Sequence, residues 1–186
     1  MNALAARLET LDEIDAAVGE ELHAAVRHKG HPWRVCVLAT TDGDIGDARS
    51  VVLREWDETR RTLLIYTDAR SPKAEQLAAH PLGTLVLWSE PLGWQLRLRV
   101  KLELQTAGLA VSSRWARLKM TPAAHDYLSP LPPGSPLDHR KTLPRESRAS
   151  FAVMLAHVQS VDWLELHAEG HRRAQFDSRG ARWVTP

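Results

Sequence analysis

Residues 94–105 alternate strictly between apolar and polar side chains, and this run constrains the fold more than any other stretch of the chain. Successive side chains of a β-strand point to opposite faces, so the alternation separates an apolar face from a charged one. The two sets are Leu96, Leu98, Val100, Leu102 and Leu104 on one face, and Gln95, Arg97, Arg99, Lys101 and Glu103 on the other. A strand of this kind is typical of an antiparallel sheet that packs one face against a core.

Several other runs also predict strands. Before the alternating run, strand-forming residues occupy 33–41, 48–55, 62–67 and 84–88. A short polar turn around Asp57 separates the second of these runs from the third, which predicts a hairpin. After the alternating run, short strands are predicted at 149–158, 160–167, 171–177 and 181–185. Many antiparallel strands with few helices favour a β-barrel within an α+β domain.

Three helical segments accompany the strands. Apolar residues recur at three- and four-residue steps over 3–28, and acidic side chains occupy the other face of that helix. Ser71-Pro72 begins a short helix, because serine is a good N-cap and proline suits the first helical position. Residues 109–128 are also predicted to be helical. We expect a single domain over 1–186, with an N-terminal helix in 1–30, a helical and proline-rich insertion at 107–148 and C-terminal strands at 149–186.

Composition excludes several classes of protein. The formal net charge of +1 is far from the general basic field of a nucleic-acid binder. The single cysteine, Cys36, cannot form an internal disulfide, which fits a reducing compartment. No apolar run approaches the ~20 residues that span a bilayer, and the acidic N-terminus differs from a secretory signal. We therefore expect a cytoplasmic protein without nucleic-acid or membrane partners. Its nine histidines lack metal-ligand spacing, so no metal site is predicted.

Cationic and hydroxyl side chains gather around the predicted hairpin and the short helix. A phosphate ester binds Arg or Lys side chains, hydroxyls and the free N–H groups at a helix start. Ser71 and Lys73 occupy such a start, and Arg49 begins the neighbouring strand of the hairpin. Arg49 and Arg54 are five residues apart, so they point to opposite faces of the sheet unless a bulge intervenes. The pattern predicts that Arg49 and Lys73 converge on one anion.

The order of these motifs resembles the pyridoxamine 5'-phosphate oxidase family, the FMN-binding split β-barrels. The resemblance extends from about Trp33 to Arg173 and is closer to the general FMN-binding branch than to the vitamin B6 enzyme. Its segments are Arg49-Ser50-Val51-Val52-Leu53-Arg54, Tyr66-Thr67, Ser71-Pro72-Lys73, Trp94-Gln95-Leu96-Arg97, Trp163 and His171-Arg172-Arg173. It implies a split β-barrel with peripheral helices, which forms a homodimer and binds FMN at the interface between the subunits.

The same resemblance implies roles for individual residues. Arg49 and Lys73 would hold the FMN phosphate, with Ser71 nearby. Tyr66 and Thr67 would flank the flavin ring. Other groups implied at the ring are Ser50, Val51, Val52, Leu53 and Arg54 along one strand, Gln95 at the polar edge, and Trp163 and Arg173 from the partner subunit. The expected activity is hydride transfer between a small-molecule substrate and FMN, because the flavin itself carries the redox chemistry.

The chain departs from the family pattern at several positions. Arg54 stands where the family has a substrate lysine, Pro72 replaces an arginine, and Glu169 replaces another arginine near His171. The residues that grip the vitamin's own phosphate have no matched counterparts, and the region in question contains Ser112, Ser113, Arg114 and Trp115. We therefore expect FMN binding but not oxidation of vitamin B6. The candidates for contact with an unidentified substrate are Arg54, His171 and Arg172.

Two other functions fit the same residues. One is a non-catalytic protein that binds or senses a flavin or a deazaflavin in the same pocket. The other is a dimeric binding module, in which the charged face of residues 94–105 contacts an acidic partner or nucleic acid.

Overall fold

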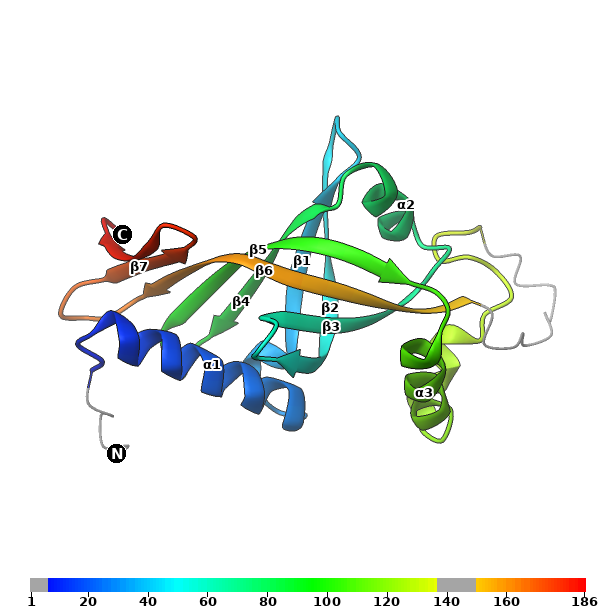
Figure 1. Cartoon of the computed structure of the whole chain (residues 1–186), viewed down its shortest axis with the longest axis horizontal. Helices are drawn as coiled ribbons and strands as arrows, with labels where there is room; N and C mark the ends of the chain where they lie inside the picture. The colour runs from blue at the N-terminus through cyan, green and yellow to red at the C-terminus, as the bar shows by residue number, and fades with distance from the viewer. Residues whose placement is uncertain (1–6, 137–149) are drawn as a thin grey trace.

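The computed structural model of the chain describes residues 7–136 and 150–186. Its strands are β1 (Val35–Thr41), β2 (Gly46–Asp57), β3 (Thr62–Asp68), β4 (Leu82–Ser89), β5 (Trp94–Gln105), β6 (Phe151–Glu165), β7 (Arg172–Asp177) and β8 (Gly180–Val184). They form one antiparallel sheet in the order β3-β2-β1-β4-β5-β6-β7-β8, and β3 also pairs with β6. This extra pairing closes β1 to β6 into a barrel, and the β7–β8 hairpin extends the sheet beyond β6 (Figure 1). The predicted split β-barrel is therefore confirmed.

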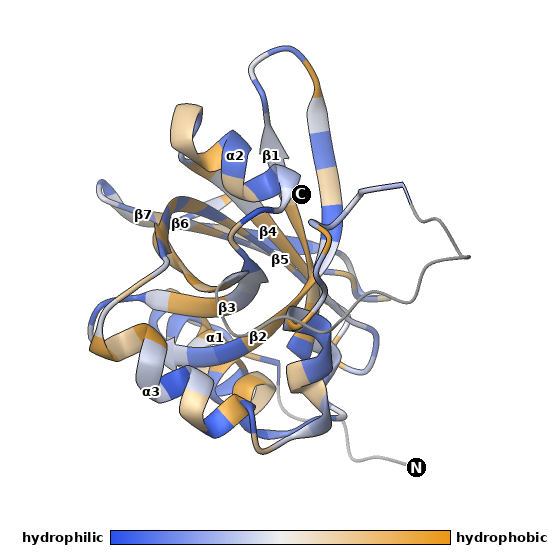
Figure 2. Cartoon of the chain, turned by 90° about the vertical axis from the view of Figure 1, so that its right-hand side faces the viewer, coloured by the Kyte–Doolittle hydropathy of each residue, from blue (hydrophilic) through white to orange (hydrophobic). Residues whose placement is uncertain are grey.

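Strand β5 has the bounds and the two faces that its sequence predicts. Leu96 and Leu98 are fully buried in the barrel interior, whereas Arg99 and Lys101 on the opposite face are exposed. Hydrophobic residues line the other strands of the barrel too (Figure 2), but without the strict alternation of β5. Burial of the apolar face is the main favourable contribution to the stability of such a barrel.

Strand β6 corrects one prediction. The two short strands predicted at 149–158 and 160–167 are one strand of 15 residues, and residue 149 lies outside the described ranges. The register with β5 shifts between Arg99, which pairs with Ser160, and Val100, which pairs with Val158. Gln159 is the extra residue of this β-bulge. A bulge bends a strand, so one half of β6 can pair with β3 while the other half pairs with β7.

Helix α1 (Leu11–Arg27) begins later than predicted. Thr10 and Glu13 form a capping box, in which the Glu13 N–H donates to Thr10 Oγ1 and the Thr10 N–H donates to Glu13 Oε2. A capping box ends the helix on its N-terminal side, so Leu8 lies outside it. The apolar stripe of α1, from Ile14 to Ala25, belongs to the same core as the barrel interior. Helix α1 therefore covers one side of the barrel (Figure 1).

The remaining helices are short. They are the 3-10 helix η1 (Pro32–Arg34), α2 (Pro72–Ala79), α3 (Leu109–Leu118) and the 3-10 helix η2 (Pro122–Tyr127). Helices α3 and η2 pack Trp115 and Tyr127 against Phe151 at the outer face of the barrel, with ring centroids 5.3 Å apart in each case. Trp33, predicted to start a strand, lies in η1 instead. None of the helices within 7–136 and 150–186 is long and apolar enough to cross a membrane.

Candidate functional site

An opening in the barrel wall lies between strands β2 and β3. Strand β2 pairs with β1 along residues 46–52, but it pairs with β3 only from Leu53 to Asp57. The register shifts between Leu53 and Glu55, so Arg54 is the bulged residue at the point where the two strands separate. Strand β3 continues to Asp68 and leads into α2. The first half of β2 is therefore paired with β1 on one side but not with β3 on the other, and this unpaired side is the split of the barrel.

Arg49 lies at this split and points toward α2. It is paired with Leu38, which is fully buried, so its side chain is on the inner face of the sheet. Its guanidinium donates to Thr40 Oγ1 at 2.6 Å and to Gln76 Oε1 of α2 at 3.2 Å. It also forms an ion pair with the carboxylate of Asp47 on its own strand. These contacts hold the guanidinium in one place beside the start of α2.

Lys73 is the second cation at the split. Its ammonium has no hydrogen bond or ion pair with the residues of 7–136 and 150–186, although the side chain is partly buried. Burial lowers the pKa of Lys73, the nearby charge of Arg49 lowers it further, and Asp68 acts in the opposite direction. Two cations held close together favour an anion between them. The structure thus places the charges of Arg49 and Lys73 near each other, and their convergence on one anion stays a prediction.

The hydroxyls of Ser71 and Thr67 face each other under the first turn of α2. Ser71 is 1% exposed and its Oγ lies 3.4 Å from Thr67 Oγ1. Ser71 is the N-cap residue by position, but its side chain makes no capping hydrogen bond. Pro72 has no N–H, and the N–H groups of Ala74 and Glu75 donate to the Ser71 carbonyl at 2.8 and 3.3 Å. The Lys73 N–H is left to bind a phosphate ester beside its own ammonium.

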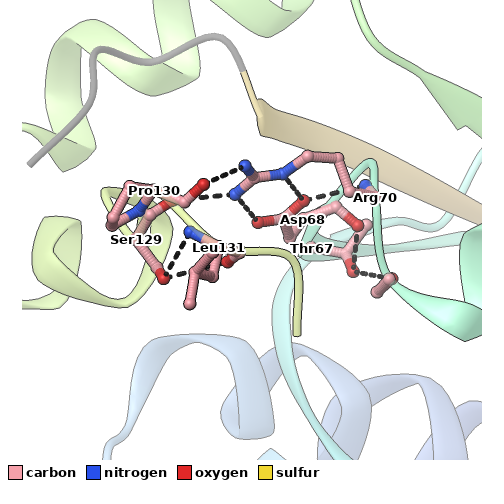
Figure 3. A network of polar contacts seen from close by, with 7 residues as sticks. Thr67, Asp68, Arg70, Ser129, Pro130 and Leu131 are labelled. Carbon is pink, nitrogen blue, oxygen red and sulfur yellow. Dashed lines mark hydrogen bonds and ion pairs between the residues drawn. The ribbon is translucent and has the colours of Figure 1, made fainter. Parts of the chain in front are cut away.

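A second network fixes the turn that precedes α2 (Figure 3). Asp68, 6% exposed, accepts hydrogen bonds from the backbone N–H of Arg70 at 2.8 Å and from its guanidinium at 2.8 and 3.1 Å. The same guanidinium donates to the carbonyl oxygens of Ser129 at 2.8 Å and Pro130 at 3.2 Å. The turn is thereby tied to the segment that follows η2. Sequence reasoning missed this contact, because the two segments are about sixty residues apart.

Arg54 lies on the opposite face of β2 from Arg49, although the bulge that the prediction allowed for falls at Arg54 itself. Its guanidinium carbon is 5.4 Å from the ring centroid of Tyr66, and its Nε is buried without a hydrogen-bond partner. Beside them, Tyr66 donates from its hydroxyl to Glu55 at 3.2 Å, and Arg114 of α3 forms an ion pair with Glu55 at 2.6 Å. Burial, followed by the charge of Glu55, raises the pKa of Tyr66.

Gln95 lies on the outer face of the barrel, away from the split. In the strand register, Val52 pairs with Val35, Gln95 pairs with both Trp88 and Leu164, and Leu164 pairs with Arg173. Neighbouring strands are ~4.8 Å apart, so Gln95 and Val52 are separated by roughly 14 Å. Within one chain, Gln95 and the residues of β2 therefore do not meet. The Gln95 amide has no side-chain hydrogen bond to any described residue.

Arg173 and Trp163 occupy opposite faces of the β6–β7 pair. Arg173 points outward and binds Asp162 with hydrogen bonds of 2.8 and 3.0 Å. Trp163 is fully buried between Trp94 and Trp183, with ring centroids 5.4 and 6.4 Å away. Direct contact between Trp163 and a bound ring would therefore require the neighbouring indoles to move.

The two candidates for substrate contact near the C-terminus differ in how many partners they already bind. Arg172 is engaged: it donates to Glu165 at 2.9 and 3.1 Å and to the carbonyl of Leu8 at 2.7 Å, and it lies over the rings of Trp163 and Trp183. His171 is exposed, and its Nδ1 accepts only the backbone N–H of His167. The described ranges contain no group of three or more His, Cys, Asp or Glu side chains that could hold a metal ion.

The sequence analysis did not identify two residues that lie at the split. Thr40 and Gln76 both contact the Arg49 guanidinium, and Thr40 donates to Gln76 Oε1 at 2.5 Å. Gln76 is three residues after Lys73, and residues at this spacing share a helix face. The spacing from Lys73 could therefore have identified Gln76 from the sequence. No sequence pattern could have identified Thr40, because its position depends on the β1–β2 register.

Comparisons with known sequences find flavin enzymes. Residues 16–106 match the family model described as the pyridoxamine 5'-phosphate oxidase FMN-binding domain. A pyridoxine/pyridoxamine 5'-phosphate oxidase of Caulobacter vibrioides is 27% identical over 184 residues, which cover 91% of this chain and 82% of that protein. A protein of the same description from Azorhizobium caulinodans is 35% identical over 96 residues, which cover 51% of this chain and 44% of the relative.

Solved structures share the fold. A pyridoxamine 5'-phosphate oxidase-related FMN-binding protein from Nostoc punctiforme superimposes with a TM-score of 0.74 at 24% identity, covering 92% of this chain and 96% of the other. PhzG from Burkholderia lata, solved with tetrahydrophenazine-1-carboxylic acid, gives a TM-score of 0.72 at 15% identity, with 100% and 99% coverage. At these identities the structural likeness establishes the barrel and its connectivity.

Proposed function

We propose that this protein, which belongs to the pyridoxamine 5'-phosphate oxidase-like family of FMN-binding split β-barrels, is an oxidoreductase that transfers a hydride between a small molecule and FMN. The observation that carries the proposal is the cation pair at the split, where Lys73 lacks a partner among the described residues and lies near Arg49. The phosphate of FMN supplies the missing negative charge. When bound, the flavin supplies the redox chemistry.

The residues of the chain then bind and orient the cofactor. Arg49 and Lys73 would hold the phosphate, and the Lys73 N–H at the start of α2 would add a hydrogen bond. The backbone of residues 50–52 would be open to the ring, because β2 pairs with β3 only from Leu53 onward. Gln95 and Arg173 would suit the polar edge of the ring, since both are polar and lie in one row of the outer face.

A homodimer brings these two groups of residues together. Within one chain Gln95 lies three strands from Val52, roughly 14 Å along the sheet, so a second copy is better placed to present Gln95 and Arg173 to the ring. The outer face between them also carries exposed apolar side chains: Val35 is 56% exposed, Val37 40% and Trp88 45%. A contiguous exposed apolar patch on a sheet is typical of an interface. A two-fold axis through this face would form two equivalent sites.

Replacing Trp88 with glutamate tests the dimer. We expect Trp88→Glu to convert the protein to a monomer and to weaken FMN binding, because a charge would be buried in the interface. Analytical ultracentrifugation with and without FMN measures both effects. Met120→Glu is the matched control, since Met120 is 81% exposed in the turn after α3 and lies outside the sheet. A Trp88→Glu protein that remains dimeric would place the interface elsewhere.

Arg54 is the strongest candidate for contact with the substrate. Its Nε is buried without a partner, and it lies beside the Tyr66 ring on the face opposite Arg49. The guanidinium also interacts with Tyr127, and a guanidinium suits a carboxylate or phosphate on the substrate. His171 is exposed and can approach from the partner subunit, whereas Arg172 already binds Glu165.

One observation favours a non-catalytic alternative. Because Arg172 is committed to Glu165 and to two indoles, one of three substrate candidates is occupied. A flavin- or deazaflavin-binding sensor needs no substrate contact. In that case the bound cofactor would not turn over with any donor.

A reductive titration separates the two functions. The FMN-loaded protein is mixed with a panel of amines and reduced nicotinamides, and flavin absorbance and turnover are followed. We expect at least one donor to be oxidised catalytically, and Arg54→Ala to lower kcat/KM at least tenfold with FMN affinity unchanged. Flavin uptake without turnover would support the sensor. A protein that takes up neither FMN nor a deazaflavin would exclude both.

A further inference from the structure

A basic groove crosses the outer face of β5, β6, β7 and β8. It encloses about 470 Å³, within the range of small-molecule sites. Five arginines and two aspartates line it, together with hydroxyl and amide side chains. The charged members are Arg97, Arg99, Arg173, Arg179, Arg182, Asp162 and Asp177. Such a surplus of arginines is unusual in a chain whose formal net charge is +1.

Asp162 holds arginine side chains in place at one end of the groove. Its carboxylate accepts from Arg97 at 2.9 Å, from Arg173 at 2.8 and 3.0 Å, and from Gln175 at 2.9 Å. Burial raises the pKa of Asp162, but these hydrogen bonds and the two positive charges outweigh it, so the pKa lies below its ordinary value. The carboxylate is therefore ionised at neutral pH and holds both guanidinium groups in fixed orientations.

Asp177 holds arginine side chains in place at the other end of the groove. It accepts from Arg182 at 2.8 Å and from the backbone N–H of Arg179 at 2.8 Å. Arg182 also donates to Gln175 at 2.9 Å, which joins the two ends through one amide. Arg97, Arg173 and Arg182 are thus held in place before any ligand arrives. Preorganised side chains lose little conformational entropy on binding, so an anion here would bind more tightly than on mobile surface arginines.

The two aspartates leave positive charge unbalanced. Arg99 lines the groove beside Thr84 and Ser160, is exposed, and has no ion pair or side-chain hydrogen bond with the described residues. Arg97 keeps a buried Nε without a partner. The Arg97 side chain as a whole is 41% exposed, so its terminal nitrogens can reach a ligand. Ser160 and Thr84 add hydroxyls at the same place.

We propose that this groove binds the diphosphate group of a small-molecule ligand. Guanidinium groups bind phosphate oxygens in pairs, and a diphosphate presents several such oxygens over a distance that one phosphate does not cover. Its two or three negative charges match the surplus of three positive charges. The site is distinct from the cation pair at the split, which lies on the inner face of β2. It shares only Arg173 with the residues proposed to contact FMN.

Isothermal titration of the FMN-saturated protein with inorganic pyrophosphate tests this site. We expect a submillimolar Kd, at least tenfold tighter than for inorganic phosphate at the same ionic strength. Arg99→Glu should weaken pyrophosphate binding at least tenfold, and it removes no contact within the described protein. Lys101→Glu is the matched control: Lys101 is two residues along the same strand and face, and lies outside the groove. It should change the Kd less than about twofold.

Several results would overturn the proposal. One is the absence of pyrophosphate binding at millimolar concentration. Another is equal weakening by Lys101→Glu, because the effect would then be long-range electrostatics. If apo protein binds pyrophosphate but FMN displaces it, the groove belongs to the flavin site. Binding of a single-stranded oligonucleotide without pyrophosphate binding would indicate a nucleic-acid surface instead. Binding of ADP in addition to pyrophosphate supports the proposal and identifies a nucleotide as one source of the diphosphate.

Discussion

FMN should bind about 10- to 100-fold more weakly to a Lys73→Ala variant than to the unmodified protein. A hydrogen bond to a charged group contributes about 1.5–3 kcal/mol, which corresponds to this range of affinity. Lys73 has no partner among the described residues, so the substitution removes no contact there and its effect falls on the ligand. Removing Lys73 also relieves its repulsion with Arg49 in the free protein. The fold itself should therefore be at least as stable as before.

The measurement is fluorescence quenching of FMN on titration with protein, with the melting temperature recorded in parallel. Arg49→Ala should act in the same direction, but it also breaks the contacts with Thr40 and Asp47, so its stability must be checked. Lys119→Ala is the control, because Lys119 is an exposed cation at the end of α3. Unchanged FMN affinity in both the Lys73 and Arg49 variants would show that the phosphate lies elsewhere.

Much of the barrel was predictable because its strands follow a simple local rule. The alternation of residues 94–105 fixed both the bounds of β5 and the face that enters the core. The Ser71-Pro72 start of α2 was predictable for the same reason, since N-terminal preferences act on adjacent residues. Features that depend on one or two neighbouring positions were therefore accessible from the sequence.

Features set by distant pairing were not accessible. Gln159-Ser160 has the polarity of a turn, yet it is a bulge, because β6 must pair with β5 throughout while also reaching β3 and β7. In α1, apolar periodicity continues before Leu11, but the Thr10–Glu13 capping box ends the helix there. In both places a local pattern was overridden by a specific hydrogen-bonding arrangement.

The features of the candidate site also divide into those that local sequence predicts and those that depend on distant pairing. Arg49 and Lys73 could be assigned from their order along the hairpin and helix, and the structure places them together. The contact between Arg70 and the carbonyls after η2 joins segments with no detectable relation in sequence. The burial of Trp163 was also beyond prediction, since alternation alone does not say which face of β6 meets the core at that end of the barrel.

Replacing Trp163 should have a large effect on the stability of the fold. It is fully buried and packs edge-on against Trp94 at 5.4 Å. Replacing a buried tryptophan with alanine removes a large apolar surface and leaves a cavity, so Trp163→Ala should lower the free energy of unfolding by about 3–5 kcal/mol. Arg172 would lose one of the two rings beneath it, which adds to the loss. Urea denaturation of the apo protein measures this change.

Trp163→Phe distinguishes packing from ligand contact. Phenylalanine keeps an aromatic ring in the core, so the variant should fold and lose less stability than Trp163→Ala. Because Trp163 exposes no surface, FMN affinity of the folded Trp163→Phe protein should stay within about twofold of the unmodified value. Trp183→Phe serves as the control, since Trp183 is 43% exposed beside the same indole. A Trp163→Phe protein of normal stability that binds FMN tenfold more weakly would mean that the indole leaves the core to meet the flavin.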